Sequence, residues 1–493
     1  MSGELKGVDR FRGSRRMSAS ESKVPLRGTG CRRRGVVVQM GSDCGFGLPS
    51  VLMLVVVLST LTFSLLLMQY FHHTAVLRDA ARLKADIAAQ NGVVFAAAGK
   101  SIGPDSVYFN DNTNARVYTY PWGLYRLVLS SGISGSTVSR HSALIGQRMN
   151  TLFNNALVYF NPQHQLVFAG EARVVGDVQV GHNGATLGVL EDMKSLPGFP
   201  VTGTIESEGS FDGFDFVELQ MQVEIFDSLL KAAGDNGLLL TSSAPARPAG
   251  GGYDFQKMVE GAGPEIVLDR DQVFSGKMVR PGGPLKILVL GAVTFAASAI
   301  VYGPVQILST GPITIPSNVR LEYTILYSQD SIEVLSASEC KAQLISPRIA
   351  VHSNARLDYP SSIVSWVSPD SVIAWQDTVA PVEPRTLTLM ENAVVEGAVV
   401  MNKRPVSLEN PELIVLRQAS KVIGLVYCDE EMTFDGTVIG TVVTNDFYFY
   451  ESPTRYFGWI RGGVIDRSCL PEAYLTPIGV TEGNIELDIL DWI

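Results

Sequence analysis

Residues 313–365 read ITIPSNVRLEYTILYSQDSIEVLSASECKAQLISPRIAVHSNARLDYPSSIVS. In this stretch Ile325, Leu344 and Ile363 each open a short apolar segment, and the three are spaced 19 residues apart. Serine, asparagine, proline and aspartate fill the intervals, as is typical of turns. A fixed period of this length predicts a structural unit that is repeated along the chain.

A second apolar series runs through the same stretch, as Ile313-Ile315, Ile332-Val334 and Ile349-Val351, at spacings of 17 to 19 residues. Together the two series predict several short strands in each repeat. We therefore expect a mainly β fold in which residues 285–465 form a β-helix, or solenoid, whose coils bury their apolar surface against one another. A β-sandwich is the alternative, but residues 313–365 contain no Asn-Gly or Asp-Gly hairpin signal.

Far upstream, residues 48–68 read LPSVLMLVVVLSTLTFSLLLM, and no charged residue occurs between Asp43 and Arg78. A helix of this length spans roughly 30 Å, the hydrocarbon thickness of a bilayer. A buried core helix and a cleaved signal peptide are the alternatives. The apolar run is longer than the h-region of a signal peptide, which favours a membrane-spanning helix.

Charge is divided unevenly along the chain. Residues 1–45 contain ten Lys or Arg and four Asp or Glu, whereas the whole chain has a net charge of −10. The positive-inside rule then predicts a single-pass protein of the inner (cytoplasmic) membrane, with a cytoplasmic N-terminus and a periplasmic or extracellular C-terminal domain. The acidic remainder makes nucleic acid an unsuitable partner.

These patterns predict a linear domain organisation. The helix should continue beyond the membrane and stop at Asn91-Gly92. The expected regions are a basic, disordered cytoplasmic segment (1–44), a transmembrane and continuing helix (45–92), a β-rich region with a helix near 217–232 (93–241), a linker (242–252), and a β-solenoid domain with a C-terminal tail (253–493).

Gly45-Phe46, followed by an unbroken apolar helix, resembles the start of type IV pilin-like proteins, in particular minor pilins and pseudopilins. The resemblance implies a prepilin-type processing site between Gly45 and Phe46. In that family a glutamate usually occupies the fifth mature position, where this chain has Ser50. Without this glutamate the usual pairing with a neighbour's amino terminus is lost, which implies a place at a filament tip or outside a filament.

The start codon stays open between Met1, Met17 and Met40; initiation at Met40 would give the short leader MGSDCG. The C-terminal region loosely resembles bactofilin-like proteins through Gly-x-Val/Ile units such as Gly170–Val178 (GEARVVGDV) and Gly436–Val442. That resemblance implies a right-handed β-helix and no particular activity.

Catalysis is not expected. A carbohydrate-active solenoid enzyme would align carboxylates on adjacent coils, but the candidates Glu333, Asp358, Asp370 and Asp377 do not recur at the coil interval. The six histidines show no metal-ligand spacing, so no metal and no cofactor are expected.

Beyond the apolar span lie Cys340, Cys428 and Cys469, an odd number that allows at most one disulfide, and their pairing stays open. The sequence therefore favours a non-enzymatic, membrane-anchored envelope protein with a structural or assembly role. Its expected partners are the membrane and either envelope, pilus or secretion assembly proteins or further copies of itself. The alternatives are a carbohydrate-active β-helix enzyme and a plain membrane-anchored adhesin or scaffold.

Overall fold

The computed structural model describes most of the chain from Gly47 onward. The described residues are 47–99, 106–109, 113–149, 151–190, 198–207, 211, 214, 216–235, 253–254, 264–280, 283–366, 384–402, 413–479 and 486–493. They fall into two compact units, which meet in the sequence between His73 and Thr74.

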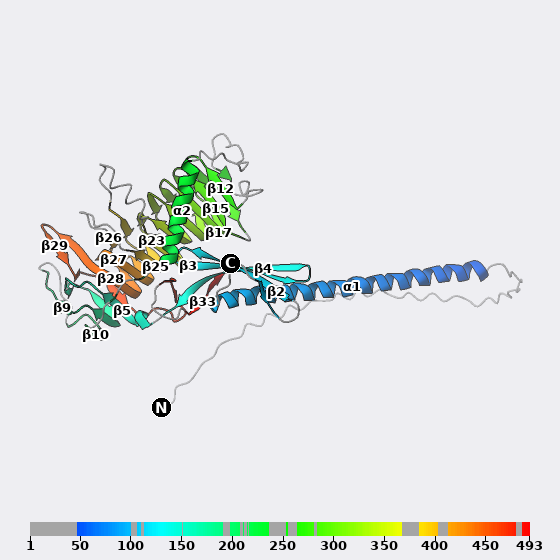
Figure 1. The fold of residues 1–493 in the computed structure, drawn as a ribbon, viewed down its shortest axis with the longest axis horizontal. Coiled ribbons are helices and arrows are strands. Elements are labelled where there is room, and N and C mark those ends of the chain that lie inside the picture. The colour runs from blue at the N-terminus through cyan, green and yellow to red at the C-terminus, as the bar shows by residue number, and fades with distance from the viewer. Residues whose placement is uncertain are drawn as a thin grey trace, which may run out of the picture. The chain divides into compact units, whose positions relative to one another are not determined.

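Helix α1 (Gly47–Ala97) is continuous over 51 residues, as Figure 1 shows. Its N-terminal part is long and apolar enough to cross a membrane. The hydroxyls of Ser59 and Thr60 donate to the main-chain carbonyls of Val56 and Val57 (2.9 and 2.8 Å). These two hydroxyl groups are therefore satisfied within the helix, as a lipid environment requires.

The predicted stop of this helix at Asn91-Gly92 is wrong, because α1 continues to Ala97. Gly92 lies inside the helix, at a close contact with a β-sheet. A Cβ at Gly92 would collide with the Ser130 hydroxyl and would lie 3.0 Å from the Cβ of Ala115. Glycine at this position therefore allows the helix to lie close to a sheet.

That sheet is antiparallel and consists of β1, β2, β3 and β4, with β32 and β33 both paired to β4. The bounds are β1 (Ser106–Tyr108), β2 (Thr113–Trp122), β3 (Tyr125–Ser134), β4 (Thr137–Arg148), β32 (Leu475–Thr476) and β33 (Leu487–Trp492). Val93 and Ala97 of α1 share a buried cluster with Val117, Val128 and Ile145 of the sheet. We call these six strands the head sheet.

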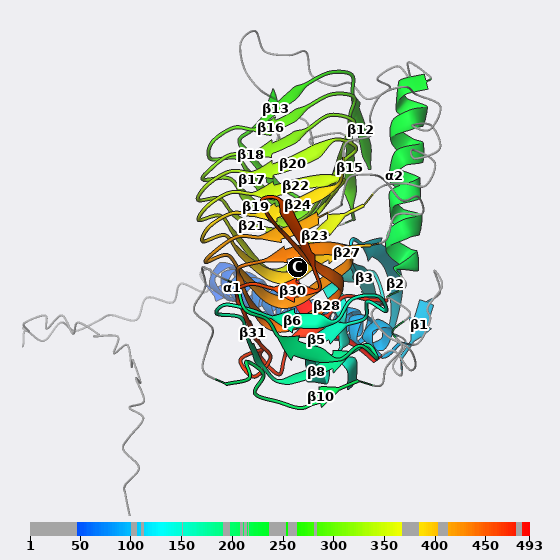
Figure 2. The same cartoon turned by 90° about the vertical axis from the view of Figure 1, so that its left-hand side faces the viewer.

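Most of the remaining strands form a parallel β-helix, which confirms the predicted fold class (Figure 2). One face stacks β15, β17, β19, β21, β23, β25, β27 and β28, and another stacks β13, β16, β18, β20, β22, β24, β26 and the end of β27. Their bounds are β13 (Gln272–Ser275), β15 (Leu285–Val289), β16 (Val293–Phe295), β17 (Ile300–Ser309), β18 (Ile313–Ile315), β19 (Arg320–Ser328), β20 (Ser331–Val334), β21 (Glu339–Ser346), β22 (Arg348–Val351), β23 (Arg356–Ser365), β24 (Thr386–Leu389), β25 (Val394–Met401), β26 (Leu413–Leu416), β27 (Lys421–Phe434) and β28 (Thr437–Glu451).

Shorter strands complete this region. They are β5 (Asn155–Tyr159), β6 (Leu166–Phe168), β7 (Arg173–Val175), β8 (Asp177–Val180), β9 (Ala185–Leu187), β10 (Ile205–Glu206), β11 (Tyr253–Asp254), β12 (Glu265–Leu268), β14 (Lys277–Val279), β29 (Thr454–Phe457), β30 (Trp459–Ile460) and β31 (Val464–Asp466), and a 3₁₀ turn covers Thr151–Asn154. Val442 of β28 pairs in parallel with Leu157 of β5, so chain segments far apart in sequence continue one stack.

The second apolar series stacks as predicted. Ile313 pairs with Ile332, and Ile332 pairs with Ile349, on three successive coils. All three side chains are buried in the cluster that fills the solenoid. Aliphatic columns of this kind bury each coil against its neighbours, which is the physical basis of the repeat.

The constant spacing of the first series predicts that Ile325, Leu344 and Ile363 lie in register on successive coils with their side chains inward, and for Ile325 this prediction is wrong. Leu344 pairs with Ile363, but its partner on the preceding coil is Leu326. The register shifts just before this point, at Tyr323, which adopts a positive φ of 57°. A one-residue bulge exchanges the two faces of a strand, so Ile325 packs outside the lumen.

Helix α2 (Val217–Asp235) lies beside the stacked coils in Figure 2, at the place where the sequence predicts a helix near 217–232. Its buried side chains include Leu219, Val223, Phe226 and Leu230, which recur at helical spacing. They share a cluster with Ile325 and with other outward-facing residues of the coils. Outward-facing residues of the coils, Ile325 among them, therefore give the helix an apolar surface to pack against.

Candidate functional site

The predicted processing site, Gly45 and Phe46, lies outside the described residues. Helix α1 begins two residues after Gly45, at Gly47, and Ser50 lies in its first turns. The helical start fits the pattern that suggested the site, and whether the chain is cut there stays a prediction.

The contact between α1 and the head sheet is unusually close. A Cβ at Gly132 of β3 would collide with the carbonyl oxygen of Ala85 and with the amide nitrogen of Ala89. Both alanines are fully buried. Main chain thus lies directly on main chain, and Gly92 repeats the close approach about two turns along the helix.

The carboxylates considered from the sequence do not form a catalytic group. Glu333 is exposed on β20, and Asp358 accepts a hydrogen bond from Arg356 Nε at 2.6 Å. Asp370 and Asp377 lie outside the described residues. In the described part of the chain, no three His, Cys, Asp or Glu side chains are placed to hold a metal ion.

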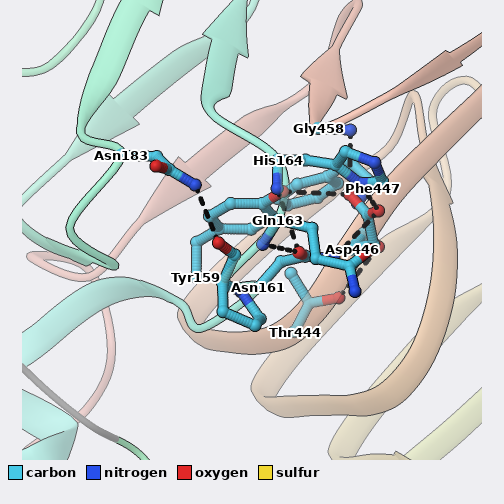
Figure 3. Close-up of polar contacts among 10 residues, drawn as sticks. Tyr159, Asn161, Gln163, His164, Asn183, Thr444, Asp446, Phe447 and Gly458 are labelled. Atoms are coloured by element: carbon cyan, nitrogen blue, oxygen red, sulfur yellow. Dashed lines mark hydrogen bonds and ion pairs between the residues drawn. The ribbon is translucent and has the colours of Figure 1, made fainter.

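A different carboxylate, Asp446 on β28, is buried and collects hydrogen bonds from several elements (Figure 3). Its Oδ1 accepts from the Tyr159 hydroxyl at 3.0 Å and from the main-chain amides of Phe447 and Gly458 at 2.9 and 2.8 Å. Its Oδ2 accepts from His164 Nδ1 at 2.6 Å.

The loop between β5 and β6 supplies a further donor, because Asn161 Nδ2 also donates to Asp446 Oδ2 at 3.1 Å. Asn161 Oδ1 in turn accepts from the amides of Gln163 and His164 at 2.7 and 3.1 Å, which fixes the loop as an Asx turn (Figure 3). Five donors therefore saturate one carboxylate. A group so enclosed and so fully bonded fastens the β5–β6 loop to β28.

Next to Asp446 lies a second acidic residue, Glu431, which pairs with it across neighbouring strands. Burial, reinforced by the charges of Asp446 and Glu430, raises the pKa of Glu431 to about 7. Its Oε2 is buried and has no hydrogen-bond partner among the residues that the structure describes. Glu431 can therefore take up or release a proton close to neutral pH.

Sequence reasoning missed this pair, although a signal was present. Glu431 and Asp446 are 15 residues apart, close to the 16 that separate Gly424 from Gly440. Those two glycines do pair on adjacent coils. A search for carboxylates at the local coil length would have found the acidic pair.

Within the described residues no disulfide forms, because Cys340, Cys428 and Cys469 are all free thiols. Cys340 and Cys428 are buried and Cys469 is exposed. Burial raises the pKa of the Cys340 thiol to about 12 and that of Cys428 further still. The two buried thiols are therefore poor nucleophiles.

These features define a class: a mainly β protein in which a long apolar N-terminal helix is joined to an antiparallel head sheet and a parallel β-helix. No protein-family model and no curated protein matches the sequence. Among solved structures, the competence-associated pilin ComZ from Thermus thermophilus matches at 9% identity and a TM-score of 0.23, covering 84% of this chain and 97% of that one.

An ice binding protein from an Antarctic bacterium, Flavobacteriaceae, matches at 10% identity and a TM-score of 0.17, covering 63% of this chain and 95% of that one. The chain thus has a weak structural resemblance to a pilin.

Proposed function

We propose that this protein is a pilin-like minor subunit of the cell envelope, anchored in the membrane by α1 and carrying the β-helix as its displayed part. Its role is structural or concerned with assembly, and it catalyses no reaction. The N-terminus lies in the cytoplasm and the head sheet and β-helix lie on the other side. Its partners are pilus or secretion assembly proteins, or further copies of the same chain.

One observation carries the proposal: the apolar part of α1 and the part seated on the head sheet belong to a single uninterrupted helix. An ordinary anchor needs only about 20 apolar residues and a linker of any kind. Here the helix continues onto the head sheet, where Gly132 brings main chain against main chain. Gly92 lies close to the Ser130 side chain. A helix that continues without interruption from an apolar segment into a packed segment suits a subunit that packs its helix beside neighbours.

The test is the amino terminus of the mature protein, isolated from cells. We expect intact-mass measurement and N-terminal sequencing to find a chain that begins at Phe46. Replacing Gly45 with leucine should leave the full-length precursor in the membrane. Gly47→Leu is the matched control, because it introduces the same side chain two residues later and should leave processing intact.

Wild-type protein that already has the full precursor mass would refute the pilin-like reading. The plain membrane anchor, for an adhesin or scaffold, would then take its place, because it needs α1 but no processing.

A further inference from the structure

A cavity of about 700 Å³ lies between the head sheet and the first coils of the β-helix. Tyr118 and Tyr120 line it from β2, and Val279 and Tyr302 line it from β14 and β17. This volume falls within the range of sites that hold small organic ligands, about 300–1,000 Å³. Tyr118 and Tyr302 are 40% and 37% exposed, so the cavity is open to solvent.

The register of the head sheet explains why polar residues gather there. Tyr118 pairs with Leu129, Leu129 with Ser142, and Ser131 with Arg140. Directly paired residues share a face, and residues two apart on a strand share it too. All five therefore lie on one face of the sheet, opposite the face that α1 covers through residues such as Val117 and Val128.

Two arginines meet at this cavity, Arg140 from the head sheet and Arg280 from the start of the coils. Within the described chain neither forms an ion pair, and no Asp or Glu side chain lines the cavity. The third basic residue, His141, is already engaged by Asp86 at 2.8 Å. The lining side chains thus carry positive charge in a chain whose net charge is −10. Ile493, whose main-chain oxygen accepts a hydrogen bond from the Ser142 hydroxyl at 2.8 Å, also lines the cavity.

The aromatic part of the lining is held in place. Tyr302 packs edge-on against Tyr323, with ring centroids 5.8 Å apart. The Tyr323 hydroxyl donates to Asp491 Oδ2 at 2.7 Å, and Lys341 lies over the ring of Tyr323 at 5.1 Å. Tyr302 therefore presents a positioned, partly exposed ring to the cavity.

We propose that this cavity binds an acidic saccharide. Two guanidinium groups without an ion-pair partner among the described residues suit a carboxylate, which arginine binds in a bidentate manner. The C–H face of a sugar ring packs on the electron-rich face of an aromatic ring, and three tyrosines are available for this. The Ser131 hydroxyl supplies a hydrogen bond to sugar hydroxyls. Nucleic acid fits less well, because a strand extends beyond the two arginines onto the surrounding acidic chain, which repels its phosphates.

The test uses the full chain in detergent micelles, with isothermal titration of trigalacturonate. We expect saturable binding, at least about tenfold weaker binding of the methyl ester of the same trisaccharide, and no comparable binding of citrate, which has charge but no sugar ring. The double variant Arg140→Gln/Arg280→Gln should weaken trigalacturonate binding at least about tenfold. Arg173→Gln, an exposed arginine on β7, is the control and should bind as wild type does.

The proposal is overturned if trigalacturonate does not bind, if the double variant binds it equally well, or if citrate or an oligothymidylate binds more tightly. Should the double variant fail to fold, the comparison between trigalacturonate and its methyl ester on wild-type protein still decides. Binding at this cavity does not require processing at Gly45, so this proposal and the proposed function fail separately.

Discussion

Gly132 of β3 lies against the main chain of Ala85 on α1, so closely that a methyl group on the glycine would collide with the alanine's carbonyl oxygen. The contact joins the end of the long helix to the head sheet. It requires glycine because the obstructing atom belongs to the helix backbone, which cannot move aside as a flexible side chain can.

Gly132→Ala should therefore destabilise the head by about 1–3 kcal/mol, the usual cost of overpacking. Thermal or chemical unfolding of the full chain in detergent measures the effect. The control is Gly234→Ala in α2, where a Cβ meets nothing within 4 Å. That substitution should be neutral or slightly stabilising, because alanine favours a helix. Equal stability of the two variants would contradict the close helix–sheet contact.

Asp446→Ala should be among the most destabilising substitutions in the β-helix region. It leaves buried donors such as the Tyr159 hydroxyl and the Gly458 amide without an acceptor. Each unsatisfied group costs about 1–3 kcal/mol, so we expect a loss of at least about 3 kcal/mol in the free energy of unfolding. Asp269→Asn, whose exposed carboxylate pairs with its neighbour Arg270, should change stability by less than about 1 kcal/mol.

The raised pKa of Glu431 leads us to expect that the free energy of unfolding depends on pH. Its pKa rises from 4.5 to about 7 in the folded protein, so the folded state binds more protons than the unfolded state between these values. Stability should therefore fall as pH rises from about 4.5 to 7, then level off. The groups that act on Glu431 are Asp446 and Glu430, which raise its pKa, and Arg455 and His164, which lower it.

Glu431→Gln should remove this part of the pH dependence and be more stable than wild type at pH 8. Denaturant unfolding at pH 5 and pH 8 provides the measurement. Glu451→Gln, an exposed residue at the end of β28, should keep the wild-type slope. An unchanged slope in Glu431→Gln would show that this carboxyl group does not titrate near neutral pH.

Thiol labelling should separate the three cysteines beyond the apolar span. Under native conditions iodoacetamide should modify exposed Cys469 well before buried Cys340 and Cys428, whose raised pKa values leave little thiolate. Peptide mapping after native and denatured labelling measures the order. Rapid native labelling of Cys340 would contradict its burial.

Protease added outside spheroplasts should digest the region after Gly92 and spare residues 1–44. The basic N-terminal segment, with ten Lys or Arg against four Asp or Glu up to residue 45, motivates this orientation. Immunodetection of tags at either end reads the result, with spheroplasts lysed before digestion as the control. Loss of the N-terminal tag from intact spheroplasts would reverse the topology.

Much of the fold could be predicted from the sequence because its signals are local. The uncharged run at 48–68 and the recurring pairs headed by Ile313, Ile332 and Ile349 each occupy a short window. In a parallel β-helix every coil pairs with the next, so a period along the chain becomes a column in space. Burial of each coil on its neighbour needs no information from distant parts of the chain.

Tertiary structure alone decided the rest. A bulge at Tyr323 placed Leu326 rather than Ile325 in the lumen, and no local pattern distinguishes two adjacent aliphatic residues. His164 meets Asp446 across 282 residues of sequence, and β33 returns to pair with β4. Such contacts form only when whole strands and loops pack together, because the two residues or strands in contact lie far apart in the sequence. The acidic pair and the cavity beneath the head sheet arise only once those elements have met.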